Sequence, residues 1–205
     1  MNLPLPNPSD SWLVIVDMQN IFVQQNQPWY SCAALPLVSN ILELAKLWND
    51  RTLLTRFVAG SHHEGSWNNY YNLDPYNKMA DRPDDDPAFD IIDELKQLAH
   101  KNSDNVVTMT TFGKWGDQSN GLRAKIPEKY PKVVLTGVAT ECCVWSTAIS
   151  AGESGAEVWL VKDGCAAGQG EPQKAVDGQN AVFTWVHPAF NYLINLTTKT
   201  ELLGK

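Results

Sequence analysis

Short apolar runs alternate with amphipathic segments along this chain, and that alternation restricts the fold more than any other feature of the sequence. The expected strands are residues 11–16, 52–58, 105–110, 133–135 and 157–162, with a last short one near 200–203. The expected helices are residues 35–48, 88–100, 122–126, 140–151, 173–186 and 188–196. Strands that alternate with helices form parallel sheets with right-handed crossovers. The sequence therefore predicts one α/β domain over residues 1–205, with a Pro-rich N-terminal arm at 1–10. The expected arrangement has three layers, α/β/α, around a doubly wound (Rossmann-like), mostly parallel sheet.

The charge balance argues against two classes of partner. The chain has 16 Lys and Arg residues against 23 Asp and Glu residues, a formal net charge of −7. Nucleic acids and anionic membranes bind basic surfaces, and the sequence contains no Lys/Arg cluster. No apolar run approaches membrane-spanning length, and residues 1–10 lack the charge and apolar core of a signal peptide. We therefore expect neither a nucleic acid nor a membrane as partner.

Cysteine usage indicates a reducing compartment. Cys32, Cys142, Cys143 and Cys165 are few for a chain of 205 residues, and they lack the spacing of a disulfide framework or a zinc finger. A cytoplasmic location fits this pattern best.

Two of these cysteines lie where an apolar strand runs directly into a helix. Thr140 is a candidate N-cap, which would place Cys142 and Cys143 in the first helical turn. The partial positive charge of a helix N-terminus stabilises a thiolate, and the free N–H groups there can hold an oxyanion. The alternative is that each cysteine is a small buried hydrophobic residue.

Charged residues follow three of the expected strands. Asp17 comes directly after residues 11–16, and ligands of parallel sheets bind beyond the carboxyl ends of the strands. An Asp that begins a turn is the alternative. Arg56 closes the second strand and could face the same crevice, and Lys114 lies in the loop TFGKWG after the third. A lysine in a loop is usually solvated.

The segment 60–86 is long and irregular. It interleaves aromatic residues, among them Trp67 and Tyr70, with the adjacent pair His62 and His63. Long loops in compact domains are usually functional, and such aromatics line pockets or subunit contacts. The histidines lack a nearby Asp-x-His arrangement, which disfavours a metal site.

Three segments together resemble the isochorismatase-like cysteine hydrolase superfamily: LVIVDMQNIF at 13–22, TFGKWG at 111–116 and VVLTGVATECCVWSTAISA at 133–151. The most specific part is the pattern G-V-x-T-(D/E)-x-C-V, which begins here at Gly137. With the order of strands and helices, the likeness covers nearly the whole chain. It implies the isochorismatase-like hydrolase fold.

The resemblance also implies a triad of Asp17, Lys114 and Cys143, with Cys143 as the nucleophile. The family's lysine commonly lies at the end of the third strand, where this sequence has Met109, and Lys114 follows five residues later. A non-proline cis peptide between Val138 and Ala139 is implied as well. This cis peptide would direct nearby backbone N–H groups, together with the N–H of Cys143, toward an oxyanion.

The activity implied by the resemblance is hydrolysis of a C–N bond of a small amide through an acyl-thioester. No cofactor is expected. Some members bind zinc through an Asp and two His, but TRFVAG stands here where that motif would begin, so we expect no catalytic metal. Candidate pocket walls are Phe22, Trp67, Tyr70 and Trp115. The resemblance also implies a homo-oligomer.

Three rival hypotheses remain. The first is a non-catalytic member of the same fold that acts through oligomer or partner contacts. The second is a nucleotide-binding protein, although G-x-G-x-x-G and G-x-x-x-x-G-K-(S/T) are both missing. The third is a redox protein with Cys142 as resolving thiol, although adjacent cysteines form a disulfide only with strain. The choice among nicotinamide-like, carbamoyl and biuret-like amides stays open.

Overall fold

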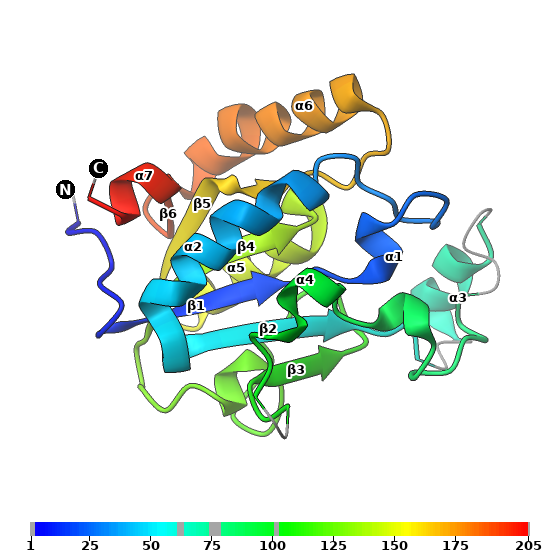
Figure 1. The fold of residues 1–205 in the computed structure, drawn as a ribbon, viewed down its shortest axis with the longest axis horizontal. Helices are drawn as coiled ribbons and strands as arrows, with labels where there is room; N and C mark the ends of the chain where they lie inside the picture. Colours follow the sequence, from blue (N-terminus) through cyan, green and yellow to red (C-terminus); the bar gives the residue numbers. More distant parts are fainter. Residues whose placement is uncertain (1–2, 61–63, 74–78, 101–102, 205) are drawn as a thin grey trace.

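The computed structural model describes residues 3–60, 64–73, 79–100 and 103–204. Within these ranges six strands form one all-parallel sheet in the order β3-β2-β1-β4-β5-β6 (Figure 1). The strands are β1 (Ser11–Val16), β2 (Thr52–Phe57), β3 (Val106–Met109), β4 (Lys132–Val138), β5 (Glu157–Ala166) and β6 (Ile194–Thr197). The predicted doubly wound α/β fold is confirmed.

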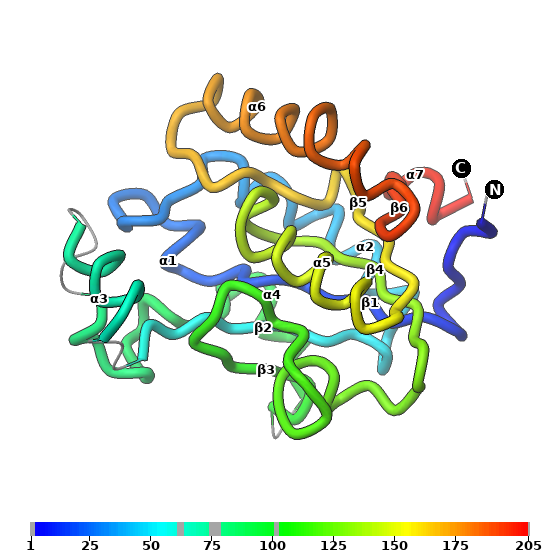
Figure 2. The backbone as a smooth tube through the Cα atoms, turned by 180° about the vertical axis from the view of Figure 1, so that it is seen from behind, coloured from blue at the N-terminus to red at the C-terminus, as the bar shows by residue number. Residues whose placement is uncertain are grey.

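Helices cover both faces of the sheet. Helix α2 crosses the face seen in Figure 1, and α5 crosses the opposite face seen in Figure 2. The helices are α1 (Asn20–Val23), α2 (Val38–Trp48), α3 (Gly65–Tyr71), α4 (Asp93–Lys96), α5 (Trp145–Glu153), α6 (Pro172–Ala181) and α7 (Lys199–Leu202). The arrangement has the three predicted layers.

Strand β1 explains why the central strands are apolar throughout. Leu13 and Ile15 pack in the core that includes α2, whereas Val14 and Val16 pack in the core that includes α5. A parallel strand covered on both faces must be apolar at every position, not at alternate ones.

The sheet order reverses between β1 and β4. From β1 the chain continues to β2 and β3 on one side, and from β4 it continues to β5 and β6 on the other. Such a switch point opens a crevice at the carboxyl ends of the two strands. Asp17 follows β1 and the turn Thr140–Val144 follows β4, so both reach this crevice. Helices α1 and α3 lie beyond the same edge of the sheet (Figure 1).

Three expected elements are wrong. The helix expected over 188–196 is a 3₁₀ turn over His187–Phe190, followed by strand β6. Residues 88–100 form only a short turn and α4, because Asn20 N–H donates to Asp90 C=O and Ile92 N–H donates to Met18 C=O. These bonds hold residues 90–92 extended against the loop after β1. The predicted strand near 200–203 is helix α7, and the last strand is β6. A capping box formed by Thr198 and Glu201 begins α7.

Gly137 lies within β4, which continues through Val138 instead of ending at the glycine. Its φ is +108°, and a Cβ built there would lie 2.1 Å from the carbonyl oxygen of Val16. Only glycine allows β4 to approach β1 this closely.

We expect Gly137→Ala to lower the free energy of unfolding by at least about 2 kcal/mol, because it adds a clash with β1 backbone to an unfavourable φ. Urea unfolding followed by tryptophan fluorescence measures this loss. Gly65→Ala is the matched control: Gly65 has φ +60° and no described atom lies within 4 Å of its Cβ position. Equal losses in the two variants would contradict the proposed clash.

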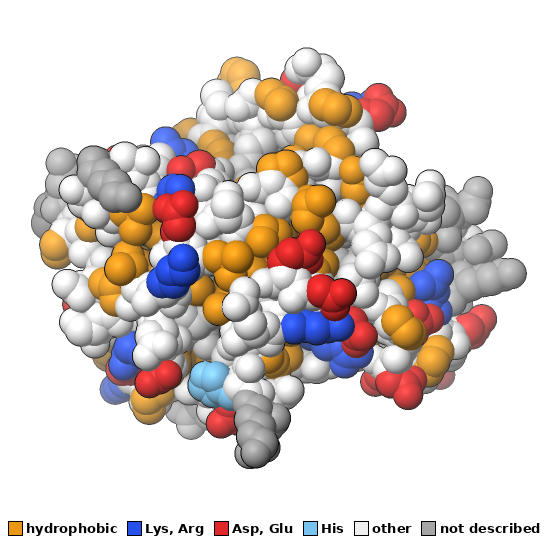
Figure 3. All heavy atoms as spheres, viewed as in Figure 1, with side chains coloured by type: hydrophobic (Ala, Val, Ile, Leu, Met, Phe, Trp, Pro, Cys, Tyr) orange, Lys and Arg blue, Asp and Glu red, His pale blue; other side chains and the backbone are white. Residues whose placement is uncertain are grey.

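The described surface carries charges of both signs. On the face shown in Figure 3, Lys and Arg side chains are interspersed with Asp and Glu side chains. Among the described residues, no helix is long and apolar enough to cross a membrane. Trp185 and Tyr192 are 80% and 100% exposed in this single chain. The expected homo-oligomer stays a prediction.

Candidate active site

The crevice contains a buried ion pair. Lys114 Nζ lies 3.0 Å from Asp17 Oδ2, and both side chains are fully buried. The Thr55 hydroxyl donates to Asp17 Oδ1 at 2.6 Å. Asp17 has φ +48°, a strained conformation that Asp tolerates better than most residues. The end of β1 is thus shaped to hold a carboxylate whose charge is balanced inside the protein.

Lys114 reaches Asp17 from the loop after β3. Its backbone N–H donates to Thr147 Oγ1 at 2.9 Å, and the Thr147 hydroxyl donates to the Cys143 carbonyl at 2.7 Å. Lys114 Nζ also donates to the Thr111 carbonyl at 2.5 Å. Met109, at the strand end, packs against the core on the α5 side. The structure therefore brings Lys114 to Asp17 even though the lysine follows the strand end by five residues.

Cys143 lies in a π-helical turn, Thr140–Val144, that leads into α5. The peptide bond between Val138 and Ala139 is cis. The Ala139 carbonyl accepts hydrogen bonds from Cys142 N–H at 3.0 Å and Val144 N–H at 3.1 Å. This turn brings the Cys143 side chain, 3% exposed, to the crevice beside β1.

Thr140 does not cap the helix, contrary to the prediction. Its hydroxyl instead donates to Gln179 Oε1 on α6 at 2.6 Å. Gln179 Nε2 donates in turn to the carbonyls of Cys165 at 2.9 Å and Lys162 at 3.1 Å. Gln179 therefore connects the turn that carries Cys143 to β5.

A cavity of about 140 Å³ opens at this turn. Its lining residues are Phe22, Trp29, Phe57, Tyr70, Phe112, Ala139, Glu141, Cys142, Cys143 and Gly168. A cavity of about 150 Å³ in another protein holds benzene, so this one suits a compound the size of one six-membered ring.

Two of the four expected pocket walls line the cavity, Phe22 and Tyr70. Trp67 lies behind them, with its ring centroid 5.8 Å from Tyr70 and 4.9 Å from Phe112. Trp115 does not reach the cavity, because it is 2% exposed and packs in the core on the α5 side.

A sequence profile of the isochorismatase domain matches residues 11–189. The chain belongs to the isochorismatase family. The match confirms the resemblance carried by the three sequence segments.

Solved structures with this fold include several hydrolases of the isochorismatase family. A cysteine hydrolase from Pseudomonas syringae pv. phaseolicola 1448A has a TM-score of 0.76 at 20% identity, covering 100% of this chain and 97% of that one. The yeast nicotinamidase Pnc1p has a TM-score of 0.68 at 18% identity, covering 91% and 99%. N-carbamoylsarcosine amidase from Thermoplasma acidophilum has a TM-score of 0.60 at 20% identity, covering 93% and 96%. Comparison with curated protein sequences found no match.

Several site residues of this isochorismatase-family protein escaped the sequence analysis. Thr55 and Thr147 are buried hydroxyls whose partners are distant in sequence. Trp29 and Glu141 line the cavity from a loop and from the cysteine turn. One sequence feature could have pointed to a site residue: the polar Thr55 lies inside an otherwise apolar strand.

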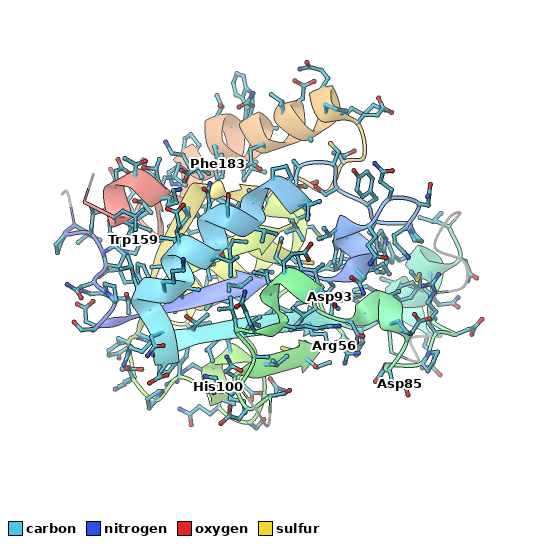
Figure 4. The ribbon with its side chains drawn as sticks, in the orientation of Figure 1. Arg56, Asp85, Asp93, His100, Trp159 and Phe183 are labelled. Carbon is cyan, nitrogen blue, oxygen red and sulfur yellow. The ribbon has the colours of Figure 1, made fainter. Side chains whose placement is uncertain are left out.

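Other predicted residues lie elsewhere. Arg56 donates to the carbonyls of Phe89, at 2.9 Å, and Asp84, and it lies near α4 (Figure 4). It is therefore not part of the crevice at Asp17. His62 and His63 lie outside the described residues. Within the described ranges, no group of three or more His, Cys, Asp or Glu side chains could hold a metal ion.

The two thiols at the cavity differ in acidity. A hydrogen bond between them lowers the pKa of Cys142. The same bond, and then burial, raises the pKa of Cys143 well above its usual range, while Lys114 acts in the opposite direction. The bond with Cys142 and burial thus both favour the neutral thiol form of Cys143.

We expect Cys142→Ala to shift the pH midpoint of Cys143 alkylation downward, because the variant removes the largest contribution that raises the Cys143 pKa. More thiolate at neutral pH then gives faster labelling. Iodoacetamide labelling with peptide mapping measures the midpoint. Cys32→Ala, in a separate hollow near α6, is the control and leaves the midpoint in place. An unchanged or higher midpoint in Cys142→Ala would refute the coupling.

Proposed function

We propose that this protein hydrolyses a C–N bond of a small amide through a thioester on Cys143. The observation that carries the proposal is the buried Asp17–Lys114 pair beside a cysteine that lines a small cavity. A buried ion pair is a weak source of stability, so its position close enough to Cys143 to interact with it electrostatically favours a catalytic use. Family membership and the fold shared with a nicotinamidase and an N-carbamoylsarcosine amidase support the same reaction class.

Acylation begins with proton transfer. Asp17, paired with Lys114, accepts the proton of Cys143 as the Cys143 sulfur attacks the amide carbonyl carbon. The C–S bond forms and the carbonyl oxygen becomes an oxyanion. Backbone N–H groups of Cys143 and of the turn after the cis peptide Val138–Ala139 stabilise that charge.

The leaving nitrogen then takes the proton from Asp17, the C–N bond breaks, and ammonia or an amine departs. Deacylation uses water. Asp17 accepts a proton from the water as the water oxygen attacks the thioester carbon. The C–S bond then breaks, and the Cys143 sulfur takes the proton back from Asp17. The products are a carboxylic acid and the regenerated thiol, and the reaction needs neither an oxidant nor a reductant.

The reaction requires a reduced nucleophile. All four cysteines are free thiols, among them Cys143. Free thiols persist in the cytoplasm, which we infer is where the protein works.

Ammonia release from small amides tests the proposed function. The panel contains nicotinamide, N-carbamoylsarcosine and biuret, each incubated with wild type and Cys143→Ala. Mass spectrometry of rapidly quenched wild-type protein detects the acyl-enzyme, whose mass exceeds that of the free chain by the acyl group. We expect turnover of at least one amide, with an adduct on the Cys143 peptide. Absence of both turnover and adduct, across this panel and with cationic amides as well, would favour the non-catalytic alternative.

A further inference from the structure

The cavity wall is mainly aromatic, and its rings come from separate parts of the fold. Phe22 belongs to α1, Phe57 ends β2 and Tyr70 belongs to α3, while Trp29 and Phe112 come from loops. Because five rings surround a volume of only about 140 Å³, most of any bound molecule would lie close to an aromatic ring.

The rings stand in two orientations. Trp29 stacks on Phe22 at 5.7 Å and 15°, and on Tyr70 at 6.4 Å and 23°. Phe57 crosses Trp29 at 74° with centroids 5.4 Å apart. An occupant therefore meets rings of both orientations. Ring faces attract cations within about 6 Å of the centroid.

One carboxylate also lines the cavity. Glu141 Oε1 accepts a hydrogen bond from Gly168 N–H at 2.9 Å, which fixes the side chain at the rim. Among the described lining residues, Glu141 is the one with an acidic or basic side chain of the Asp, Glu, Lys or Arg type.

The lysine of the site already has a carboxylate partner of its own. Lys114 is fully buried and paired with Asp17. Its Nζ lies 4.7 Å from the centroid of Phe57, a ring that lines the cavity. The described part of the lining thus combines aromatic rings with a negative charge.

We propose that this cavity selects small amides that carry a positive charge, such as a quaternary ammonium group, over neutral and anionic amides of the same shape. The proposal rests on the proposed function and specifies its substrate class. Aromatic rings alone would accept a neutral apolar group equally well. The Glu141 carboxylate adds attraction for a cation and repulsion for an anion.

Three amides separate charge from shape. Betaine amide carries a trimethylammonium group, 3,3-dimethylbutanamide replaces that group with a neutral tert-butyl group, and succinamate carries a carboxylate. We expect kcat/KM for betaine amide to exceed that for the neutral isostere by about tenfold, and succinamate to be the poorest substrate. Equal values for the first two, or a preference for succinamate, would overturn the proposal.

Glu141→Gln tests the carboxylate. The glutamine oxygen can still accept the Gly168 N–H, so the rim keeps its hydrogen bond while losing its charge. We expect the ratio of kcat/KM for betaine amide to kcat/KM for the neutral isostere to fall several-fold. An equal loss for both amides would indicate a structural effect and count against charge selection.

Tyr70→Leu tests the rings, with Tyr70→Phe as its matched control. Leucine keeps an apolar surface and removes the ring, whereas phenylalanine keeps the ring. We expect the cation preference to fall about threefold in Tyr70→Leu and to persist in Tyr70→Phe. A preference that survives both changes would mean that the rings do not recognise the cation.

Binding separates this proposal from the proposed hydrolysis. The dissociation constants of the three amides are measured by calorimetry on Cys143→Ala, which cannot turn them over. Selective binding of betaine amide without hydrolysis by wild type would support recognition of cationic amides by the cavity and would refute the proposed reaction. Hydrolysis of other amides, with no preference for the cation in binding or turnover, would refute the substrate class alone.

Discussion

Lys114→Met is expected to lower the free energy of unfolding by about 3–5 kcal/mol, because it leaves the Asp17 carboxylate fully buried without its cation. Methionine fills much of the volume of the lysine stem, so the loss reports charge more than packing. Urea unfolding of wild type and Lys114→Met at neutral pH measures this loss.

A double variant tests the origin of the loss. Asp17→Asn combined with Lys114→Met removes both charges, and we expect it to be more stable than Lys114→Met alone, since no uncompensated charge remains. If the two losses simply added, the ion pair would not account for the instability of the single variant. Asp17→Asn alone, Lys114→Met alone and the double variant are all expected to lose amide turnover.

Cys143→Ala is expected to reduce turnover of any accepted amide by about 10⁴-fold or more, the order of loss seen when a nucleophile is removed. Cys143 is 3% exposed and alanine creates only a small cavity, so folding is expected to survive. Initial rates of ammonia release, with unfolding curves for each variant, separate catalysis from stability.

Cys142→Ala is the matched comparison for the loss of turnover expected in Cys143→Ala. Both thiols line the cavity, yet only Cys143 matches the position implied by the family pattern. We expect Cys142→Ala to retain turnover and to shift its pH dependence toward lower pH, together with the Cys143 pKa. Loss of turnover in Cys142→Ala with retention in Cys143→Ala would reassign the nucleophile.

Much of the fold follows from local signals. Continuous apolar runs gave β1, β2 and β4, because strands covered on both faces must be apolar throughout. Asp17 and the cysteine turn were predictable for the same reason, since each follows directly from the end of such a strand. Their meeting at one crevice required only the parallel topology.

The errors arise where long-range contacts override local patterns. The apolar stripe in residues 88–100 has helical spacing, but hydrogen bonds to the loop after β1 hold residues 90–92 extended. Thr140 has the chemistry of an N-cap, but Gln179 of α6 takes its hydroxyl. The cavity is assembled from distant loops, which explains why Trp29 and Glu141 were not predictable from the sequence.

The Thr147 hydroxyl joins two parts of the site that come from separate stretches of the chain. It accepts from the backbone N–H of Lys114 and donates to the carbonyl of Cys143, four residues earlier on the same helical segment. One side chain thus fixes the spacing between two residues that the chain supplies from separate loops. Loss of this hydroxyl is therefore expected to disturb the lysine loop and the cysteine turn together.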